Sequence, residues 1–116
     1  MILIIGAEAS GKREFAKNLG YTEDDFTTDP FDGKRVVYGV QNILFADHTR
    51  TQELYDALAD KEVVICNEVG SGVIPIGREM RLGREAAGRL CVLLAKDAEA
   101  VVRMVCGIPT IIKGQI

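Results

Sequence analysis

The amino-acid sequence predicts an α/β domain built on a mainly parallel sheet. Short β-branched runs alternate with segments of helical periodicity, and this alternation is typical of parallel strands connected by helices on both faces of a sheet. Only Gly107–Pro109 separates the last two runs. This gap is too short for a crossover helix, so these runs predict an antiparallel hairpin at the sheet edge. The 116 residues suffice for a single domain, residues 1–116.

The individual elements follow from local patterns. Five runs are predicted as strands: Ile2–Ile5, Arg35–Val40, Glu62–Asn67, Val101–Cys106 and Thr110–Lys113. Three segments are predicted as helices: Lys12–Leu19, Thr49–Asp60 and Gly77–Lys96. Thr49 and Gln52 have the spacing of a capping box. Turn-forming residues in Gly20–Lys34 predict an exposed loop.

The first predicted strand runs directly into a phosphate-binding loop motif. Residues Gly6–Lys12 have the spacing Gly-x-x-x-x-Gly-Lys and precede a predicted helix, which is the context this motif requires. The glycines let backbone amides surround a phosphate, the lysine contacts the outer phosphates, and the positive end of the next helix adds to the attraction. The motif therefore predicts a three-layer sandwich of the phosphate-loop NTPase type. The predicted nucleotide-binding residues are Gly6, Ala7, Glu8, Ala9, Ser10, Gly11, Lys12 and Arg13.

Two residues depart from the usual motif. Arg13 stands where a Ser or Thr hydroxyl normally binds Mg²⁺. The motif therefore predicts GTP or ATP as a cofactor, but it supports Mg²⁺ binding less strongly. Arg13 either contacts phosphate oxygens itself or points into solvent. Glu8 adds a carboxylate inside the loop, which repels phosphate unless the side chain points away.

Composition excludes several classes of protein. The net charge of -3 and the small number of aromatic residues argue against a nucleic-acid-binding surface. No apolar run reaches the roughly 18–20 residues that span a bilayer, and the apolar start lacks the basic leader of a signal peptide. Cys66, Cys91 and Cys106 are widely spaced and are interpreted as buried, reduced thiols of a cytoplasmic protein.

Two polar residues follow the third predicted strand. In an open α/β sheet, ligands bind beyond the carboxyl ends of the strands, so we expect Asn67 and Glu68 near the phosphate loop. The Glu68 carboxylate is a candidate to hold Mg²⁺ through water, and the alternative is a capping acceptor at the end of the strand. Gly70, Gly72 and Pro75 predict a shaped turn.

The segment that begins at Asn67 also resembles a known family. Asn67–Pro75 reads Asn-Glu-Val-Gly-Ser-Gly-Val-Ile-Pro and is similar to the Asn-Glu-Val-Gly-x-Gly-[Ile/Val]-[Val/Ile]-Pro segment of the adenosylcobinamide kinase/adenosylcobinamide-phosphate guanylyltransferase family of cobalamin biosynthesis. Further similarity lies in Ser10–Lys12, in Arg84–Arg89 with Glu85 in place of Asp, in Leu94-Ala95, and in Val105–Pro109 through Lys113.

The resemblance implies a function and a set of site residues. Family members use ATP or GTP to phosphorylate the aminopropanol hydroxyl of adenosylcobinamide, and they then transfer GMP through a guanylyl-histidine. Carried over to this chain, Gly6, Ser10, Gly11 and Lys12 would hold phosphates, Lys12 and Glu68 would be catalytic, and Asn67, Glu68 and Arg84 would lie around the substrate. The resemblance also implies a homo-oligomer, for which the edge strand Thr110–Lys113 is available.

Departures from the family leave two hypotheses open. The chain is shorter, Cys91-Val92 replaces an Asn-Gln pair, and His48, the only histidine, lacks the family's basic context. Val36–Ala46 resembles a later strand-and-loop segment of the family, which places the guanylylated histidine among the missing residues. The chain is then either a reduced kinase without the transferase half, or a relic that binds nucleotide or anion as a binding or regulatory module. An unrelated small-nucleotide kinase would need an arginine-rich lid, whereas Gly20–Lys34 is acidic.

Overall fold

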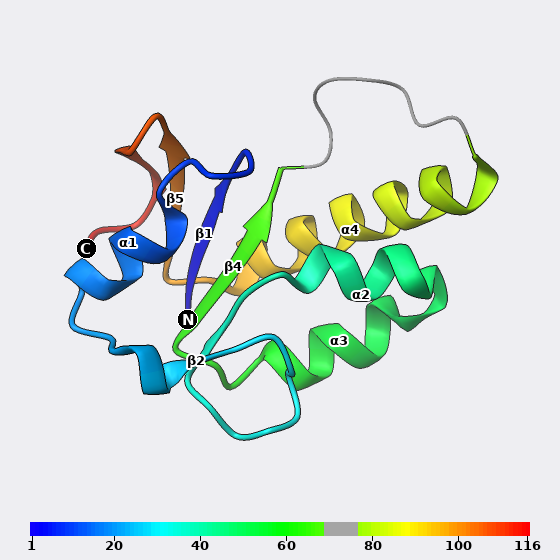
Figure 1. The fold of residues 1–116 in the computed structure, drawn as a ribbon, viewed down its shortest axis with the longest axis horizontal. Helices are drawn as coiled ribbons and strands as arrows, with labels where there is room; N and C mark the ends of the chain where they lie inside the picture. The colour runs from blue at the N-terminus through cyan, green and yellow to red at the C-terminus, as the bar shows by residue number, and fades with distance from the viewer. Residues whose placement is uncertain (69–76) are drawn as a thin grey trace.

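A computed structural model describes residues 1–68 and 77–116 and confirms the α/β class (Figure 1). One six-stranded sheet has the order β2-β3-β4-β1-β5-β6. All neighbouring strands are parallel except β5 and β6, which form the predicted antiparallel hairpin at the edge. The strands are β1 Ile2–Gly6, β2 Phe26–Thr27, β3 Val36–Val37, β4 Val63–Asn67, β5 Ala100–Val105 and β6 Ile108–Lys113.

Helices cover both faces of this sheet and complete the three-layer arrangement of the phosphate-loop NTPase type. The α-helices are α1 Lys12–Asn18, α2 Val40–Ala46, α3 Thr51–Leu58 and α4 Arg78–Asp97, with short 3₁₀ turns η1 Glu23–Asp25 and η2 His48–Arg50. In Figure 1 the helices α2, α3 and α4 lie together on one side of the sheet, and α1 lies on the other. Within the described part of the chain, no helix combines the length and the apolar character needed to cross a membrane.

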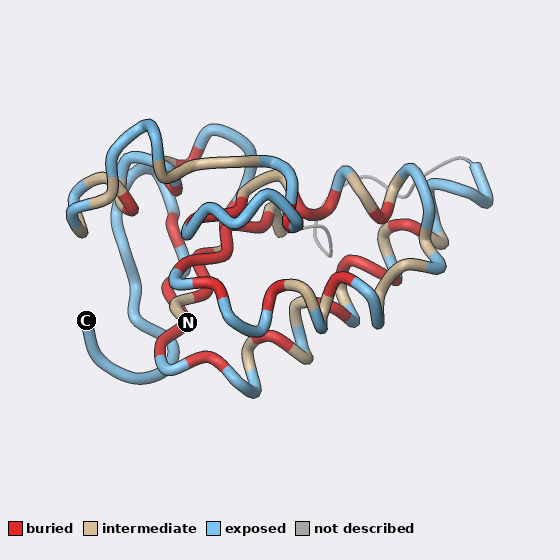
Figure 2. The backbone as a smooth tube through the Cα atoms, turned by 90° about the horizontal axis from the view of Figure 1, so that it is seen from below, coloured by how far each residue is buried: buried red, intermediate tan, exposed pale blue. Residues whose placement is uncertain are grey.

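Alternating side chains of the sheet form two separate apolar cores, as the pleat of a strand requires. On the three-helix face, Leu3 and Val64 pack with helix residues such as Leu44 and Leu90. On the α1 face, strand residues including Ile4 pack with Ala16, the buried apolar residue of α1. Figure 2 shows the buried residues concentrated along the central strands and on the inner sides of the helices.

The register of the central strands determines where the site forms. Strand β1 is parallel to both β4 and β5, and Gly6 lies opposite Asn67 on one side and Met104 on the other. The carboxyl ends of all three strands therefore meet at one edge of the sheet. The loop that follows β1 is held between the ends of its two neighbours.

The structure corrects the predicted strand Arg35–Val40. Only Val36–Val37 is a strand, and Val40 already belongs to α2. Gly39 has a φ of 68°, a left-handed conformation that glycine adopts without steric cost, and this reverses the chain between β3 and α2. The segment Val36–Ala46, interpreted from the sequence as a strand and loop, is therefore mainly a helix.

Two further predictions about loops and caps need correction. The capping box at Thr49 is wrong, because Asp47 caps η2 by accepting a hydrogen bond from the backbone N–H of Thr49, and α3 begins at Thr51. Gly20–Lys34 is mostly exposed as predicted, but it also contains η1 and the short strand β2. The shaped turn predicted from Gly70, Gly72 and Pro75 lies outside the described residues.

Candidate functional site

The loop between β1 and α1 has the backbone conformation of a wrapped anion-binding loop. Ala9 and Gly11 both have positive φ values, 56° and 93°, and these turn the chain back toward the start of α1. A Cβ atom at Gly6 would lie 2.5 Å from Ser10 Oγ and 2.7 Å from the Met104 carbonyl oxygen. Only glycine therefore fits at this first position of the motif.

Both neighbouring strand ends hold this loop in place. The backbone N–H of Glu68, just after β4, donates to the Gly6 carbonyl oxygen at 2.8 Å. The backbone N–H of Gly107, in the β5–β6 turn, donates to the Ser10 carbonyl oxygen at 3.0 Å. The loop is thus fixed near its two ends before any ligand binds, which lowers the ordering cost of binding.

Lys12 is the buried cation of the loop. Its side chain is only 7% exposed, and its Nζ donates to the Ala7 carbonyl oxygen and contacts Ser10 Oγ at 3.4 Å. Burial lowers the pKa of Lys12, while the carboxylates of Glu8 and Glu68 partly oppose that shift. A largely desolvated ammonium that lacks a carboxylate partner at ion-pair distance among the described residues is suited to an anionic ligand.

A cavity of about 460 Å³ opens beside the loop. One wall consists of the loop and the start of α1. The opposite wall comes from the chain around β3 and the start of α2, and the floor includes strand β4. The lining residues are Glu8, Ala9, Ser10, Gly11, Lys12, Arg13, Glu14, Thr28, Tyr38, Gly39, Gln41, Asn42, Ile65 and Asn67.

Arg13 stands over an aromatic ring at the edge of this cavity. Its guanidinium carbon is 5.0 Å from the centroid of the Tyr38 ring, a cation–π distance that contributes about 0.5–1 kcal/mol at an exposed site. Phe26 packs against Tyr38 with the edge-to-face geometry of an aromatic pair, at a centroid distance of 6.4 Å. Arg13 is exposed, and its guanidinium lies over Tyr38 within the cavity lining.

Asn67 lies next to the loop, as the sequence predicted. Its Nδ2 donates to the Glu8 carboxylate at 2.7 Å, and its backbone N–H donates to the Oε1 of Gln41 at 3.2 Å. Gln41 is itself only 6% exposed. Asn67 thus connects the loop to the start of α2, and it draws the Glu8 carboxylate toward β4.

Glu68 faces a different partner from the one expected. Its carboxylate accepts two hydrogen bonds from Arg103 on β5, at 2.5 Å from Nε and 3.1 Å from the second terminal nitrogen. Glu68 is not among the residues that line the cavity. It is therefore an ion-paired residue at the sheet edge beside the loop.

The residues present do not fit a magnesium ion at the position where the motif usually binds one. Arg13 puts a positive charge in place of the ligating hydroxyl, and the carboxylate of Glu68 is already neutralised by Arg103. Among the described residues no group of three or more His, Cys, Asp and Glu side chains is close enough together to hold a metal ion.

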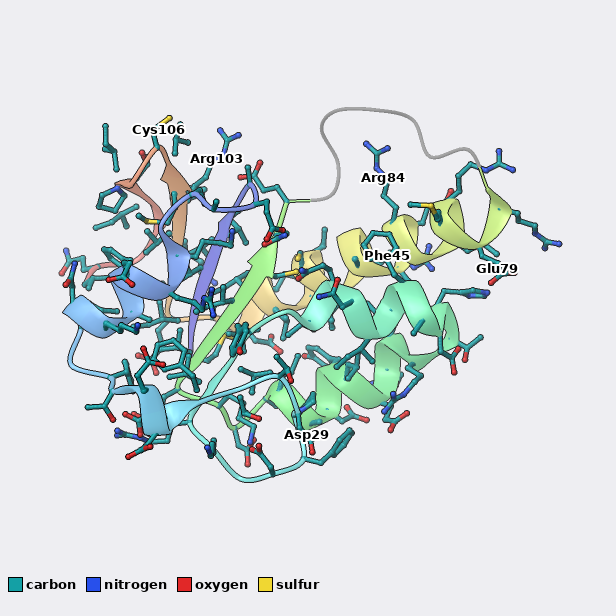
Figure 3. The ribbon with its side chains drawn as sticks, in the orientation of Figure 1. Asp29, Phe45, Glu79, Arg84, Arg103 and Cys106 are labelled. Atoms are coloured by element: carbon teal, nitrogen blue, oxygen red, sulfur yellow. The ribbon has the colours of Figure 1, made fainter. Side chains whose placement is uncertain are left out.

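Arg84, predicted to lie around the substrate, is on α4, outside the cavity lining. Figure 3 shows it on α4, whereas Arg103 lies on β5. Sequence reasoning missed Tyr38, Gln41 and Arg103. For Tyr38 a signal existed, because it directly follows a strand parallel to β4 and therefore lies at the ligand-binding edge.

A model of one protein family matches most of the chain. The family is described as cobinamide kinase / cobinamide phosphate guanyltransferase, and the match covers residues 35–112. The chain belongs to this family. The matched part includes β3, α2, β4, α4 and the β5–β6 hairpin, and it contains Asn67, Glu68 and Arg84. The phosphate loop lies before the match, so its interpretation depends on its own motif and geometry. No curated protein matches the chain.

Proposed function

We propose that this member of the cobinamide kinase / cobinamide phosphate guanyltransferase family binds a nucleoside triphosphate, ATP or GTP, through its loop and phosphorylates a cobinamide. The observation that carries the proposal is Lys12, a buried cation that faces a preformed cavity of about 460 Å³. The other wall of that cavity comes from Tyr38–Asn42, within the part that matches the family. The phosphate loop and the part of the chain that matches the family therefore border the same cavity.

The chemistry follows from this placement. The loop amides and the Lys12 ammonium would hold the β- and γ-phosphates, as in other loops of this spacing. The hydroxyl oxygen of the cobinamide attacks the γ-phosphorus, and the bond from the γ-phosphorus to the β–γ bridging oxygen breaks. The nucleoside diphosphate leaves, and the hydroxyl proton passes to solvent. Lys12 stabilises the negative charge that develops on the bridging and terminal oxygens.

A second candidate function, nucleotide binding without turnover, is favoured by the pair Glu68–Arg103. Phosphoryl transfer depends on positioned charges, and the carboxylate expected to organise the reaction is already engaged at 2.5 Å by an arginine. In this alternative the domain is a binding or regulatory module of the same family.

Guanylyl transfer is not part of the proposal. It would need a histidine near the phosphates. His48, the only histidine of the chain, follows α2 at the end opposite to the cavity-lining Asn42 and is absent from the lining. Incubation with labelled GTP is expected to leave no covalent label. A label that disappears in His48→Ala would contradict this expectation.

One experiment separates the two candidate functions. Calorimetric titration with ATP and GTP, each with and without Mg²⁺, measures binding, and the addition of adenosylcobinamide followed by mass spectrometry detects the phosphorylated product. Lys12→Met is expected to weaken nucleotide binding by about 1.5–3 kcal/mol, the size of a charge-assisted contact. Lys34→Met, which removes an exposed lysine that is not among the lining residues, serves as the matched control.

Each outcome has a defined meaning. Product formation that depends on Lys12 supports the kinase. Binding without product at high protein concentration supports the module. Equal binding by the wild type, Lys12→Met and Lys34→Met would refute the use of the loop, and no binding by any of them would refute both candidates.

A further inference from the structure

We infer that the loop binds triphosphate without a divalent cation, with the Arg13 guanidinium supplying the positive charge that a magnesium ion supplies elsewhere. This inference rests on the proposed nucleotide binding and specifies how it occurs. It begins from the position of Arg13, directly after Lys12 and in the lining of the same cavity. The two cations are therefore adjacent at the place where the outer phosphates would lie.

The Arg13 side chain is positioned for this role by its neighbours. The Tyr38 ring supports the guanidinium at 5.0 Å, and Phe26 supports that ring at 6.4 Å. A stacked guanidinium keeps its N–H donors at its edge, where they can bind phosphate oxygens two at a time. Within the described residues, Arg13 has no carboxylate at ion-pair distance. Its charge is thus available to an anion.

The carboxylate that would complete a magnesium site already has another partner. A carboxylate at the end of the neighbouring strand usually completes the coordination of magnesium through water. Here that carboxylate, Glu68, is held by Arg103 through two hydrogen bonds. A divalent cation bound through Glu68 would have to compete with Arg103, and one bound at the position of the usual hydroxyl would meet the positive charge of Arg13. Electrostatic repulsion opposes this arrangement.

The test uses the full chain and measures the affinity for ATP and for inorganic triphosphate by calorimetry, in EDTA and in excess Mg²⁺. The wild type is expected to bind with an affinity that changes less than about threefold between the two conditions. Arg13→Ser, which restores the hydroxyl, is expected to lose about 10–100-fold in EDTA, the effect of one charge-assisted contact, and to regain part of this affinity with Mg²⁺. Lys34→Ser removes one positive charge outside the cavity lining and controls for net charge.

The possible failures are distinct. Wild-type binding that appears only with Mg²⁺ overturns the metal-independent mode and leaves the proposed nucleotide binding intact. An Arg13→Ser protein that binds as tightly as the wild type in EDTA overturns the role of Arg13. Absence of binding in both conditions overturns the proposed function together with this inference. Thermal melts of the variants establish that they are folded.

A different observation carries a second proposal. We propose that Cys66 and Cys91 form a reversible disulfide, a modification site between the end of β4 and the middle of α4. Their sulfur atoms are 3.4 Å apart, so they need to approach by only about 1.4 Å to reach disulfide bonding distance. Cys66 is buried, Cys91 is partly buried and Cys106 is exposed. The prediction that all three thiols are buried is therefore wrong for Cys106.

The oxidant we name is a low-molecular-weight disulfide such as oxidised glutathione. The Cys91 thiolate attacks one of its sulfurs, which forms a mixed disulfide and releases one glutathione thiolate. The Cys66 thiol then loses its proton to solvent, and its thiolate attacks the Cys91 sulfur of the mixed disulfide. The bond between Cys91 and glutathione breaks, the intrachain bond forms, and the second glutathione leaves as a thiolate. Cys91 reacts first because it is more exposed and because its contact with Cys66 lowers the pKa of Cys91, while that contact and burial raise the pKa of Cys66.

Thiol counting tests this proposal in a Cys106→Ser background, which removes the exposed thiol. After incubation with oxidised glutathione and denaturation, the two remaining thiols are expected to disappear together, with a mass loss of two hydrogens and no glutathione adduct. The additional change Cys66→Ser is expected to trap the glutathione adduct on Cys91. Retention of both thiols, or a stable adduct while Cys66 is present, would overturn the proposal.

Discussion

The two faces of the sheet differ in how they use their side chains. On the three-helix face, α2, α3 and α4 enclose the larger apolar core of the described residues, with thirteen buried members against seven on the α1 face. The α1 face instead borders the cavity, where Lys12, Arg13 and Tyr38 lie beside the floor residue Ile65. A larger apolar core contributes more to folding, whereas a single short helix leaves room for a ligand. This difference indicates that stability and binding are separable by mutation.

The largest expected effect of a single change lies on the three-helix face. Leu90 of α4 is fully buried in the larger core, so Leu90→Ala is expected to lower the free energy of unfolding by about 2–5 kcal/mol. Nucleotide affinity of the folded fraction is expected to be unchanged. Chemical denaturation measures the first quantity and calorimetry the second. Val92→Ala, at an exposed position of the same helix, is the control, and a loss there as large as at Leu90 would contradict the assignment of the core.

The next effect tests how closely α4 approaches α2. A Cβ atom at Gly83 would lie 2.8 Å from Phe45 Cδ1 and 2.9 Å from its Cα; Figure 3 labels Phe45 on α2 beside α4. Because backbone must move to relieve this clash, Gly83→Ala is expected to destabilise the fold by about 1–3 kcal/mol. A Cβ at Gly88 would meet nothing within 4 Å, so Gly88→Ala is expected to stabilise the helix by about 0.5–1 kcal/mol. Thermal denaturation of both variants should give opposite signs.

The sequence predicted correctly those elements that depend on local residue patterns. The first strand, the wrapped loop that follows it, β4, α4 and the terminal hairpin follow from periodicity and motif spacing, and the structure confirms these elements of the fold. Helix α2 was not predictable in the same way, because Val40–Ala46 is rich in apolar residues that also suit a strand. Its packing against Gly83 of α4 is a tertiary contact, and such contacts override local propensity. The two-residue strand β2 is too short to show any period.

The same distinction applies to the site. Parallel strands end at one edge of a sheet, and that rule placed Asn67 and Glu68 beside the loop. The partner of Glu68 was not accessible from the sequence, because it depends on the register that sets Arg103 opposite Ile5. Likewise, the contact of Arg13 with Tyr38 could be predicted only if the end of β3 were already known.

A smaller effect is expected on the α1 face, and it has the opposite sign. Burial lowers the pKa of Lys12, so the folded state disfavours the charged form at neutral pH. Lys12→Met removes this penalty and is expected to raise the free energy of unfolding by roughly 1 kcal/mol while it weakens nucleotide binding. Between the lowered pKa and the ordinary value the unfolded chain binds more protons, so wild-type stability should rise with pH across that interval relative to the variant. Lys34→Met is the control. A Lys12→Met protein that is less stable than the wild type would contradict the expected desolvation penalty of the buried ammonium.

The smallest expected effect concerns the charged surface around η1 and Arg35, which we call the rim. Ion pairs at a protein surface contribute little to stability. Asp25 accepts a hydrogen bond from the backbone N–H of Thr22 at 2.9 Å and pairs with Arg35 at 2.9 Å, and these two contacts, in that order, lower the pKa of Asp25. A lowered pKa stabilises the fold above the ordinary aspartate value of about 3.9, and this contribution is lost as the pH falls through the lowered pKa. Asp25→Asn should therefore melt slightly below the wild type at neutral pH, and the difference should vanish in acid. Asp24→Asn removes the same charge from the neighbouring residue of η1. If it lowers the melting temperature equally, net charge rather than the paired carboxylate of Asp25 is responsible, and the rim would then contribute to stability only through its overall charge.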